Sequence, residues 1–224
     1  MVLFTVAALA IGLAVVGYAV LQRGGSAPVD DLSPPGVAIP TELADGRTLG
    51  RADAPVTVEI WSDFQCPACG LLAERVEPSL IAEHVTPGTA RIVYRDAAFQ
   101  GIRTGATYDE SVESAAAARC AADEGKFWQM HAWIFANWDG ENQGAYRADR
   151  LRAIAQAAGL DMAAYDACMA TGDKQVAVRA ETADGVSGGI NATPTLIING
   201  SLYSGPLSVP EISRAISDAA QAAG

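Results

Sequence analysis

Apolar and polar positions alternate shortly after the first fifty residues. Val56, Val58 and Ile60 are apolar, and the residues between them are polar, which predicts a strand with one buried face. Residues 66–85 then follow a helical period, and residues 90–96 form a second run rich in β-branched and aromatic side chains. The order strand, helix, strand predicts two parallel strands joined by a helical crossover.

Helical patterns dominate the middle of the chain. Residues 108–185 are helical in pattern almost throughout, and strand character returns at residues 195–198. The dipeptide Asn199-Gly200 then predicts a type I′ hairpin turn, and a last helix begins at Ser208. The layout is therefore βαβ, an all-helical insertion, then ββα, which predicts an α/β fold with one sheet built from two halves.

The first part of the chain has a different character. Residues 1–22 carry no charged side chain and are long enough to cross a bilayer, so we expect a transmembrane signal anchor, with a cleaved signal peptide as the alternative. Arg23 follows this run, so the positive-inside rule does not favour an external domain. Residues 23–48 are rich in Pro and Gly and predict a flexible linker, which leaves 49–224 as the folded domain.

Length and charge narrow the possible functions. A chain of 224 residues accommodates the anchor and one domain with a substantial core. The formal net charge is −11, with no cluster of Lys or Arg, so a nucleic acid partner is excluded by repulsion. No segment is typical of a dimerisation domain, so we expect a monomer.

The spacing of two cysteines indicates redox chemistry. Cys66 and Cys69 form a C-x-x-C pair that follows a predicted strand and opens a predicted helix. The unpaired N–H groups and the dipole at a helix N-terminus favour an anion, so the pKa of Cys66 should fall below that of a free thiol. We expect Cys66 to be the exposed nucleophile and Cys69, one turn deeper, to resolve mixed disulfides.

Other uses of this cysteine pair fit less well. A c-type haem site needs a histidine where Gly70 stands, and a structural zinc site needs two more ligands. A purely structural disulfide across so short a loop would contribute little stability. We therefore expect no metal and no cofactor.

The remaining cysteines, Cys120 and Cys168, lie in helical patterns. A structural disulfide between them would close a loop of 49 residues, for which chain entropy suggests about 4 kcal/mol. Two free buried thiols are the alternative. A disulfide here would require an oxidising compartment, in agreement with the N-terminal apolar segment.

Three segments of the chain resemble a known family. Residues 62–69 read SDFQCPAC, residues 120–128 read CAADEGKFW, and residues 192–200 read ATPTLIING. In this order they resemble the DsbA-like thioredoxin-fold proteins, particularly the extracytoplasmic group, over residue 49 to the C-terminus. The resemblance implies a thioredoxin-like fold with an all-helical insertion between its two halves.

The resemblance also implies the surroundings of the redox pair. A cis peptide bond is expected between Thr193 and Pro194, placed beside the two cysteines. Because proline donates no backbone hydrogen bond, this loop would leave neighbouring backbone groups free for a substrate strand. Pro67 and Ala68 would support the site together with the cis-proline loop.

The chain departs from the family at one position. Relatives commonly carry a buried acidic residue six positions before the first cysteine, where this sequence has Ile60. Glu59 should point to the opposite face of the strand, and Asp63 is expected in a loop. We therefore assign no proton relay from the sequence.

The activity that the resemblance implies is thiol–disulfide exchange outside the cytosol. We expect an oxidase that donates its Cys66–Cys69 disulfide to secreted cysteine-containing proteins as they fold. A membrane partner of the DsbB or vitamin K epoxide reductase type would reoxidise it, and a single-pass anchor would hold it at the cell membrane. The alternatives are a reductase or isomerase on the same fold, as in cytochrome maturation, and a non-catalytic metal-binding or substrate-holding module.

Overall fold

The structure, a computed structural model, describes residues 31–104 and 108–223. The membrane anchor expected at residues 1–22 lies outside these residues. None of the helices in the described ranges combines the length and the apolar character that a bilayer crossing requires.

A single mixed sheet organises the described part of the chain. Its strand order is β1-β2-β4-β3-β5-β6, with β3 and β4 parallel and every other neighbouring pair antiparallel. The loop between β5 and β6 has the two residues with positive φ that a type I′ turn needs, Asn199 at 46° and Gly200 at 79°. The strands are β1 (Ala44–Asp45), β2 (Thr48–Leu49), β3 (Val56–Ser62), β4 (Ala90–Asp96), β5 (Thr195–Ile198) and β6 (Ser201–Leu202).

The ordered domain begins earlier than the expected boundary at residue 49. The short helix η1 (Thr41–Leu43) and the hairpin β1–β2 fall inside the predicted linker, 23–48, and β2 joins the sheet beside β4. Leu43 packs against the core, and Leu49 is fully buried. Two-residue strands are too short to show an alternating pattern, which is why the sequence did not predict them.

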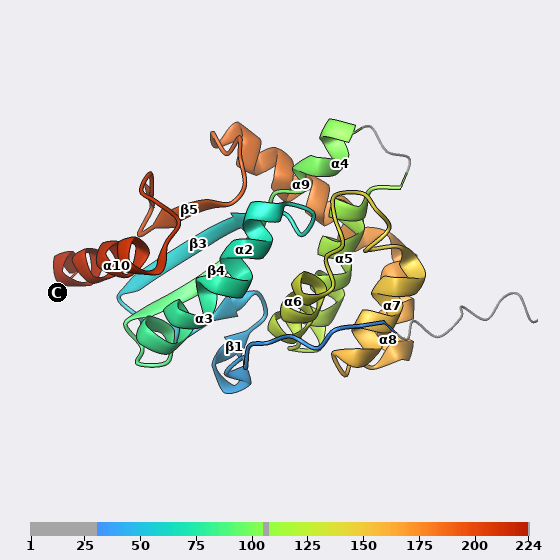
Figure 1. Cartoon of the computed structure of the whole chain (residues 1–224), viewed down its shortest axis with the longest axis horizontal. Helices are drawn as coiled ribbons and strands as arrows, with labels where there is room; N and C mark the ends of the chain where they lie inside the picture. The colour runs from blue at the N-terminus through green and yellow to red at the C-terminus, as the bar shows by residue number, and fades with distance from the viewer. Residues whose placement is uncertain (1–30, 105–107, 224) are drawn as a thin grey trace, which may run out of the picture. The chain divides into compact units, whose positions relative to one another are not determined.

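Helices follow the strands in the predicted order. The helix expected over residues 66–85 is divided into two α-helices and a π-helical turn. A separate all-helical segment stands at one side of the sheet (Figure 1). The predicted α/β fold with a helical insertion is confirmed. The helices are α2 (Pro67–Arg75), α3 (Glu77–Leu80), the π-helical turn η2 (Ile81–Val85), α4 (Phe99–Thr104), α5 (Glu110–Asp123), α6 (Phe127–Ala136), α7 (Ala148–Ala157), α8 (Met162–Thr171), α9 (Asp173–Ser187) and α10 (Val209–Ala223).

The two faces of the sheet are covered by different helices. Burial alternates strictly along β3 and β4, and α10 and η2 contact the face that carries Ile60 and Tyr94. Trp61 points to the other face, where its ring lies against Gly185 of α9. Glu59 also points there, as expected from the sequence, and it pairs with Arg95 at 2.8 Å.

A charged cluster joins the insertion to the sheet. Asp96, at the end of β4 and 1% exposed, binds Arg47 at 3.2 Å and Arg119 of α5 at 2.6 Å. Glu181 of α9 binds the same two arginines, each at 2.6 Å. Because the charges are shielded from water and each has more than one partner, removing one of them would leave an uncompensated buried charge. The cluster therefore fixes α5 and α9 beside the carboxyl ends of the parallel strands.

Candidate active site

The C-x-x-C pair lies where strand β3 leads into helix α2. Cys66 is the N-cap residue, with an extended backbone at φ −81° and ψ 122°. Pro67 follows in the first turn, where the missing N–H costs no hydrogen bond. Gly70 donates its backbone N–H to the Cys66 carbonyl at 3.1 Å, which closes the first turn around Cys69. The local sequence thus places both sulfurs at the positive end of a helix.

The cis-proline loop meets the cysteine pair in space. The sulfur of Cys66 lies 3.4 Å from the backbone carbonyl oxygen of Thr193, across 127 positions of sequence. The peptide bond between Thr193 and Pro194 is cis. Because this loop covers the sulfur, Cys66 is only 7% exposed, so the expectation of an exposed nucleophile needs correction. Cys66 is nevertheless the more accessible sulfur, since Cys69 is 1% exposed.

Hydrogen bonds stabilise a thiolate at Cys66. A hydrogen bond from the Cys69 thiol lowers the pKa of Cys66 to about 5, against the opposing effect of burial. The Thr193 side chain and the backbone N–H groups of Cys69 and Ala68 also contribute to this lowering. These N–H groups are the unpaired donors of the first helical turn. At neutral pH Cys66 is therefore an anion.

The second sulfur behaves in the opposite way. Burial, the hydrogen bond with Cys66 and the charge of Cys66 raise the pKa of Cys69 well above its ordinary value. Hydrogen bonds from the Asp63 backbone and the Ser62 side chain oppose this rise. The pair therefore holds a thiolate at the more accessible of two buried sulfurs and a thiol at the other, which is the arrangement for nucleophilic attack by one sulfur and resolution by the other.

Asp63 anchors the loop before the cysteines. Its buried carboxylate accepts backbone N–H groups from Gln65 at 2.9 Å, Phe99 at 2.8 Å and Gln100 at 2.9 Å. Burial raises the pKa of Asp63 to about 6, and these hydrogen bonds limit the rise. No role for Asp63 was predicted from the sequence, because two of its partners lie more than 35 positions away.

Gln65 ties the same loop to the helical insertion. Its side-chain oxygen accepts the backbone N–H of Asn142, and its side-chain nitrogen lies 3.3 Å from the carboxylate of Glu110. Glu110 in turn accepts the backbone N–H groups of Gly144 and Tyr146, both at 2.8 Å. The insertion therefore holds the residue directly before the nucleophile in place. No sequence motif indicated this network.

Apolar surface surrounds the accessible sulfur. Pro67 and Ala68 are exposed, and Leu71 on the next turn of α2 is 50% exposed. The backbone N–H of Thr193 makes no hydrogen bond within the described part of the chain. An extended peptide lying beside Thr193 would find both a free donor and an apolar surface next to Cys66.

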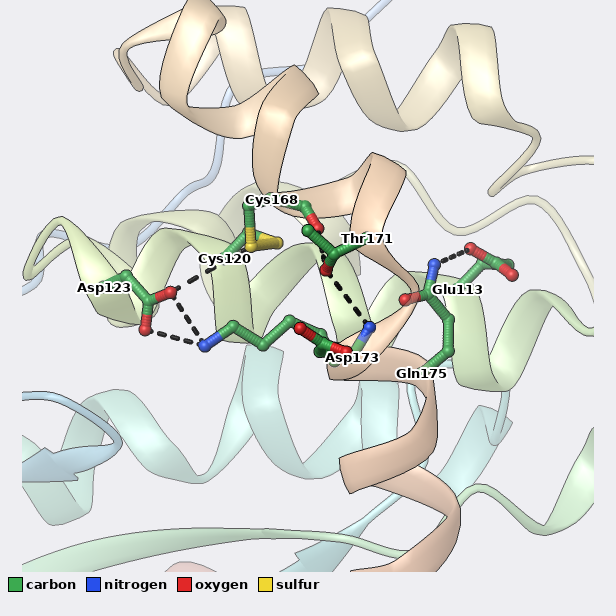
Figure 2. Close-up of a disulfide and its surroundings, with 8 residues drawn as sticks. Glu113, Cys120, Asp123, Cys168, Thr171, Asp173 and Gln175 are labelled. Atoms are coloured by element: carbon green, nitrogen blue, oxygen red, sulfur yellow. Dashed lines mark hydrogen bonds and ion pairs between the residues drawn. A yellow bond between two sulfur atoms is a disulfide. The ribbon is translucent and has the colours of Figure 1, made fainter.

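Cys120 of α5 is disulfide-bonded to Cys168 of α8, the pairing that the sequence analysis preferred. Figure 2 shows polar contacts that join α5 to α9 on either side of this bond. Lys174 of α9 binds Asp123 of α5 at 2.7 Å, and Gln175 of α9 donates a hydrogen bond to Glu113 of α5 at 3.0 Å. These two contacts reinforce the covalent link between α5 and α8. Cys120 is 2% exposed, so its sulfur is shielded from solvent.

Residues 31–104 and 108–223 contain no group of three or more His, Cys, Asp or Glu side chains that could hold a metal ion.

Two known proteins are similar to this chain in sequence. A Na(+)/H(+) antiporter, NhaA 1 of Salinispora arenicola, is 32% identical over 81% of this chain but over only 26% of its own length. A protein named as a probable disulfide bond formation protein D, from Bacillus cereus, is 28% identical over 48% of each chain. The chain thus spans about a quarter of the length of the antiporter that it matches.

The fold is shared with solved structures. The oxidised crystal structure of BdbD from Bacillus subtilis superposes with a TM-score of 0.70 at 20% identity, covering 86% of this chain and all of that one. The thioredoxin family profile matches residues 42–218, which include β2, the C-x-x-C pair, the helical insertion and the cis-proline. The chain therefore belongs to the thioredoxin family.

Proposed function

We propose that the protein is a thiol–disulfide oxidoreductase that donates the Cys66–Cys69 disulfide to cysteine-containing proteins. One observation carries the proposal: the pKa of Cys66 is lowered to about 5, while the pKa of Cys69 is raised well above its ordinary value. A pair with this asymmetry has one sulfur that leaves readily and one that is protonated after it leaves.

The exchange proceeds in two displacements. A substrate thiolate attacks the sulfur of Cys66, a mixed disulfide forms, and the electron pair of the broken bond passes to Cys69, which then takes a proton. A second substrate thiolate attacks the substrate sulfur of the mixed disulfide and releases Cys66 as a thiolate. The substrate loses two electrons and gains a disulfide, and the protein becomes the dithiol.

The direction of the disulfide exchange follows from the stability of Cys66 as a leaving thiolate. Thiolate character at Cys66 stabilises the reduced protein, and a stabilised reduced form makes the disulfide a stronger oxidant. The similarity to the Bacillus cereus protein, which is named for disulfide bond formation, supports this direction as well.

The proposed setting is outside the cytosol, at the cell membrane, with secreted proteins as substrates. The Cys120–Cys168 bond supports this setting, because structural disulfides persist in oxidising compartments. A membrane reoxidase of the DsbB or vitamin K epoxide reductase type would restore the Cys66–Cys69 disulfide. We propose that the protein acts as a monomer anchored through its N-terminal segment.

Equilibration of the purified protein with glutathione buffers tests this function. We expect a reduction potential of the Cys66–Cys69 pair nearer the DsbA value of about −120 mV than the thioredoxin value of about −270 mV. In parallel, the oxidised protein should introduce disulfides into reduced, unfolded ribonuclease, and Cys66→Ser should not. A thioredoxin-like potential together with reduction of substrate disulfides would instead identify a reductase.

A further inference from the structure

A cavity of about 330 Å³ lies under the segment that precedes β1. This segment, residues 32–39, passes α6 on its way to β1 and forms the roof of the cavity (Figure 1). A cavity of about 150 Å³ with apolar walls already holds benzene, so this space can hold an aromatic ring with a short chain. The apolar lining includes Val37, Ile39, Ala73, Ile81, Ala132 and Phe135.

The roof is attached at both ends. The backbone N–H of Ser33 donates to the side-chain oxygen of Asn137 at 2.9 Å, and the Asn137 side-chain nitrogen donates to the Ser33 carbonyl at 3.0 Å. Leu32 and Ile39 pack against the main core. These contacts hold the roof in place over the cavity.

Two buried polar side chains line the same cavity, Glu77 of α3 and His131 of α6. Glu77 is 5% exposed, and its carboxyl group makes no hydrogen bond within the described part of the chain. Its Oε2 lies 3.7 Å from Nε2 of His131, beyond hydrogen-bond distance, and this Nε2 is buried and has no partner among the described residues. Since buried polar groups are nearly always hydrogen-bonded, the two side chains indicate a ligand for this cavity.

Aromatic rings keep the imidazole beside Glu77. The ring of His131 packs against Phe135 at a centroid distance of 4.9 Å and against Trp128 at 5.1 Å. Burial lowers the pKa of His131 to about 3, so the imidazole is neutral at pH 7 and carries one nitrogen that can accept a hydrogen bond.

The charges around the cavity favour a cationic ligand. Two acceptors 3.7 Å apart can both bind one nitrogen that lies about 2.8 Å from each. A primary ammonium group has three N–H donors and a positive charge, whereas a hydroxyl has one donor and no charge. A carboxylate ligand would be repelled by Glu77 and by Glu74, which is exposed at the mouth of the cavity. The net charge of −11 also attracts cations.

We propose that this cavity binds a small primary amine with an apolar body. The ammonium group donates hydrogen bonds to Glu77 and His131, and the body packs against the apolar walls and the roof. Neither Cys66 nor Cys69 lines the cavity, so the site does not depend on the proposed exchange of disulfides.

Calorimetric titration of the full-length protein with phenethylamine tests the proposal. The matched ligand is 2-phenylethanol, which has a hydroxyl in place of the ammonium group. At pH 8.5 we expect one equivalent of phenethylamine to bind at least about tenfold more tightly than the alcohol, because a charge-assisted hydrogen bond replaces a neutral one.

The pH dependence of binding provides a second readout that needs no variant. Burial raises the pKa of Glu77 to about 8, so below this pH a proton competes with the ammonium group for the carboxylate. The affinity for phenethylamine should therefore fall about tenfold between pH 7 and pH 6. Glu74 and His131 are the other titratable side chains that line the cavity, and the roof segment has none.

Two substitutions that remove the same charge locate the site. Glu77→Gln should lower the affinity for phenethylamine to that for 2-phenylethanol and abolish its dependence on pH. Glu83→Gln is the control, because Glu83 is exposed on η2 and does not line the cavity, and its affinity should equal that of the wild type. Cys66→Ser should also bind the amine as the wild type does.

Four results would overturn the proposal. They are no binding of millimolar phenethylamine, equal affinities for the amine and the alcohol, equal losses in Glu77→Gln and Glu83→Gln, and loss of binding in Cys66→Ser. The third would mean attraction to the acidic surface alone, and the fourth would place the amine at the redox pair. Failure of the wild type to oxidise substrate thiols while it binds the amine would contradict only the proposed function.

Discussion

The sulfur of Cys66 and the backbone carbonyl oxygen of Thr193 lie 3.4 Å apart, which brings the cis-proline loop onto the N-terminus of α2. The Thr193 side chain also contributes to the low pKa of Cys66. A loop that is distant in sequence therefore helps to set the charge of the nucleophile.

Replacing Thr193 should weaken this effect. Thr193→Val removes the side-chain hydrogen bond to the Cys66 thiolate and should raise the pKa of Cys66 by about one unit. One pKa unit corresponds to about 1.4 kcal/mol, which is the order of the free energy lost with such a hydrogen bond. The pH dependence of alkylation measures this value. Thr195→Val is the matched control, since the Thr195 hydroxyl donates to the Ala192 carbonyl at 2.7 Å rather than to the sulfur. Equal pKa values in Thr193→Val and the wild type would contradict the assignment.

Removing the second disulfide should lower stability and leave the redox pair intact. Cys120→Ala combined with Cys168→Ala should reduce the free energy of unfolding by about 3–4 kcal/mol, because the crosslink restricts a long loop of the unfolded chain. Urea unfolding measures the loss. The pKa of Cys66 should not change in the same variant. An unaltered unfolding midpoint would show that the bond has no structural role.

Glu77 of α3 and His131 of α6 form a buried pair, with Glu77 Oε2 3.7 Å from His131 Nε2. Burial raises the pKa of Glu77 to about 8 from 4.5 and lowers the pKa of His131 to about 3. The folded protein thus retains the Glu77 proton between pH 4.5 and 8, where the unfolded chain has lost it. The Glu77 contribution to stability should therefore fall as the pH rises through this window. The unfolded chain binds a proton at His131 that the folded protein excludes up to about pH 6.5, which opposes the fall, so the net loss of stability should lie between about pH 6.5 and 8.

Glu77→Gln tests this pH dependence. The variant has no carboxyl group to ionise, so its stability should fall less between pH 5 and 8, with an advantage over the wild type of up to about 4 kcal/mol at pH 8. Urea unfolding across this range gives the comparison. Glu74→Gln, on the exposed side of α2, should follow the wild-type profile. Parallel profiles for Glu77→Gln and the wild type would rule out a shifted Glu77.

The close packing of Trp61 on α9 predicts a steric effect. A Cβ atom at Gly185 would lie 2.5 Å from Cζ3 of the Trp61 ring, closer than real contacts allow. Gly185→Ala should therefore destabilise the fold by about 1–3 kcal/mol through overpacking. Gly188→Ala is the control, because the nearest atom to its new Cβ is 3.4 Å away. Thermal unfolding of the two variants would separate them, and equal midpoints would contradict the packing described.

Local patterns in the sequence were sufficient to predict most of the fold. Alternation predicted β3, and the dipeptide Asn199-Gly200 predicted the hairpin, because both depend on neighbouring residues. The hairpin β1–β2 was missed, since its two-residue strands carry no periodic signal and are held by pairing with β4.

The candidate site was predictable only in part for a similar reason. The spacing of Cys66 and Cys69 indicated redox chemistry directly. The partners of Asp63 and Gln65, and the covering of Cys66 by Thr193, depend on contacts between segments far apart in sequence. Burial of the nucleophile could not be read from the residues around it, because the covering loop comes from the second half of the sheet.

The ionisation of Cys66 is the property on which the proposed oxidase activity depends most directly. We predict that thiolate absorbance at 240 nm, recorded against pH for the reduced protein, will give a transition near pH 5 that is absent in Cys66→Ser. A single transition near the value of about 8.5 for a free cysteine would contradict the account.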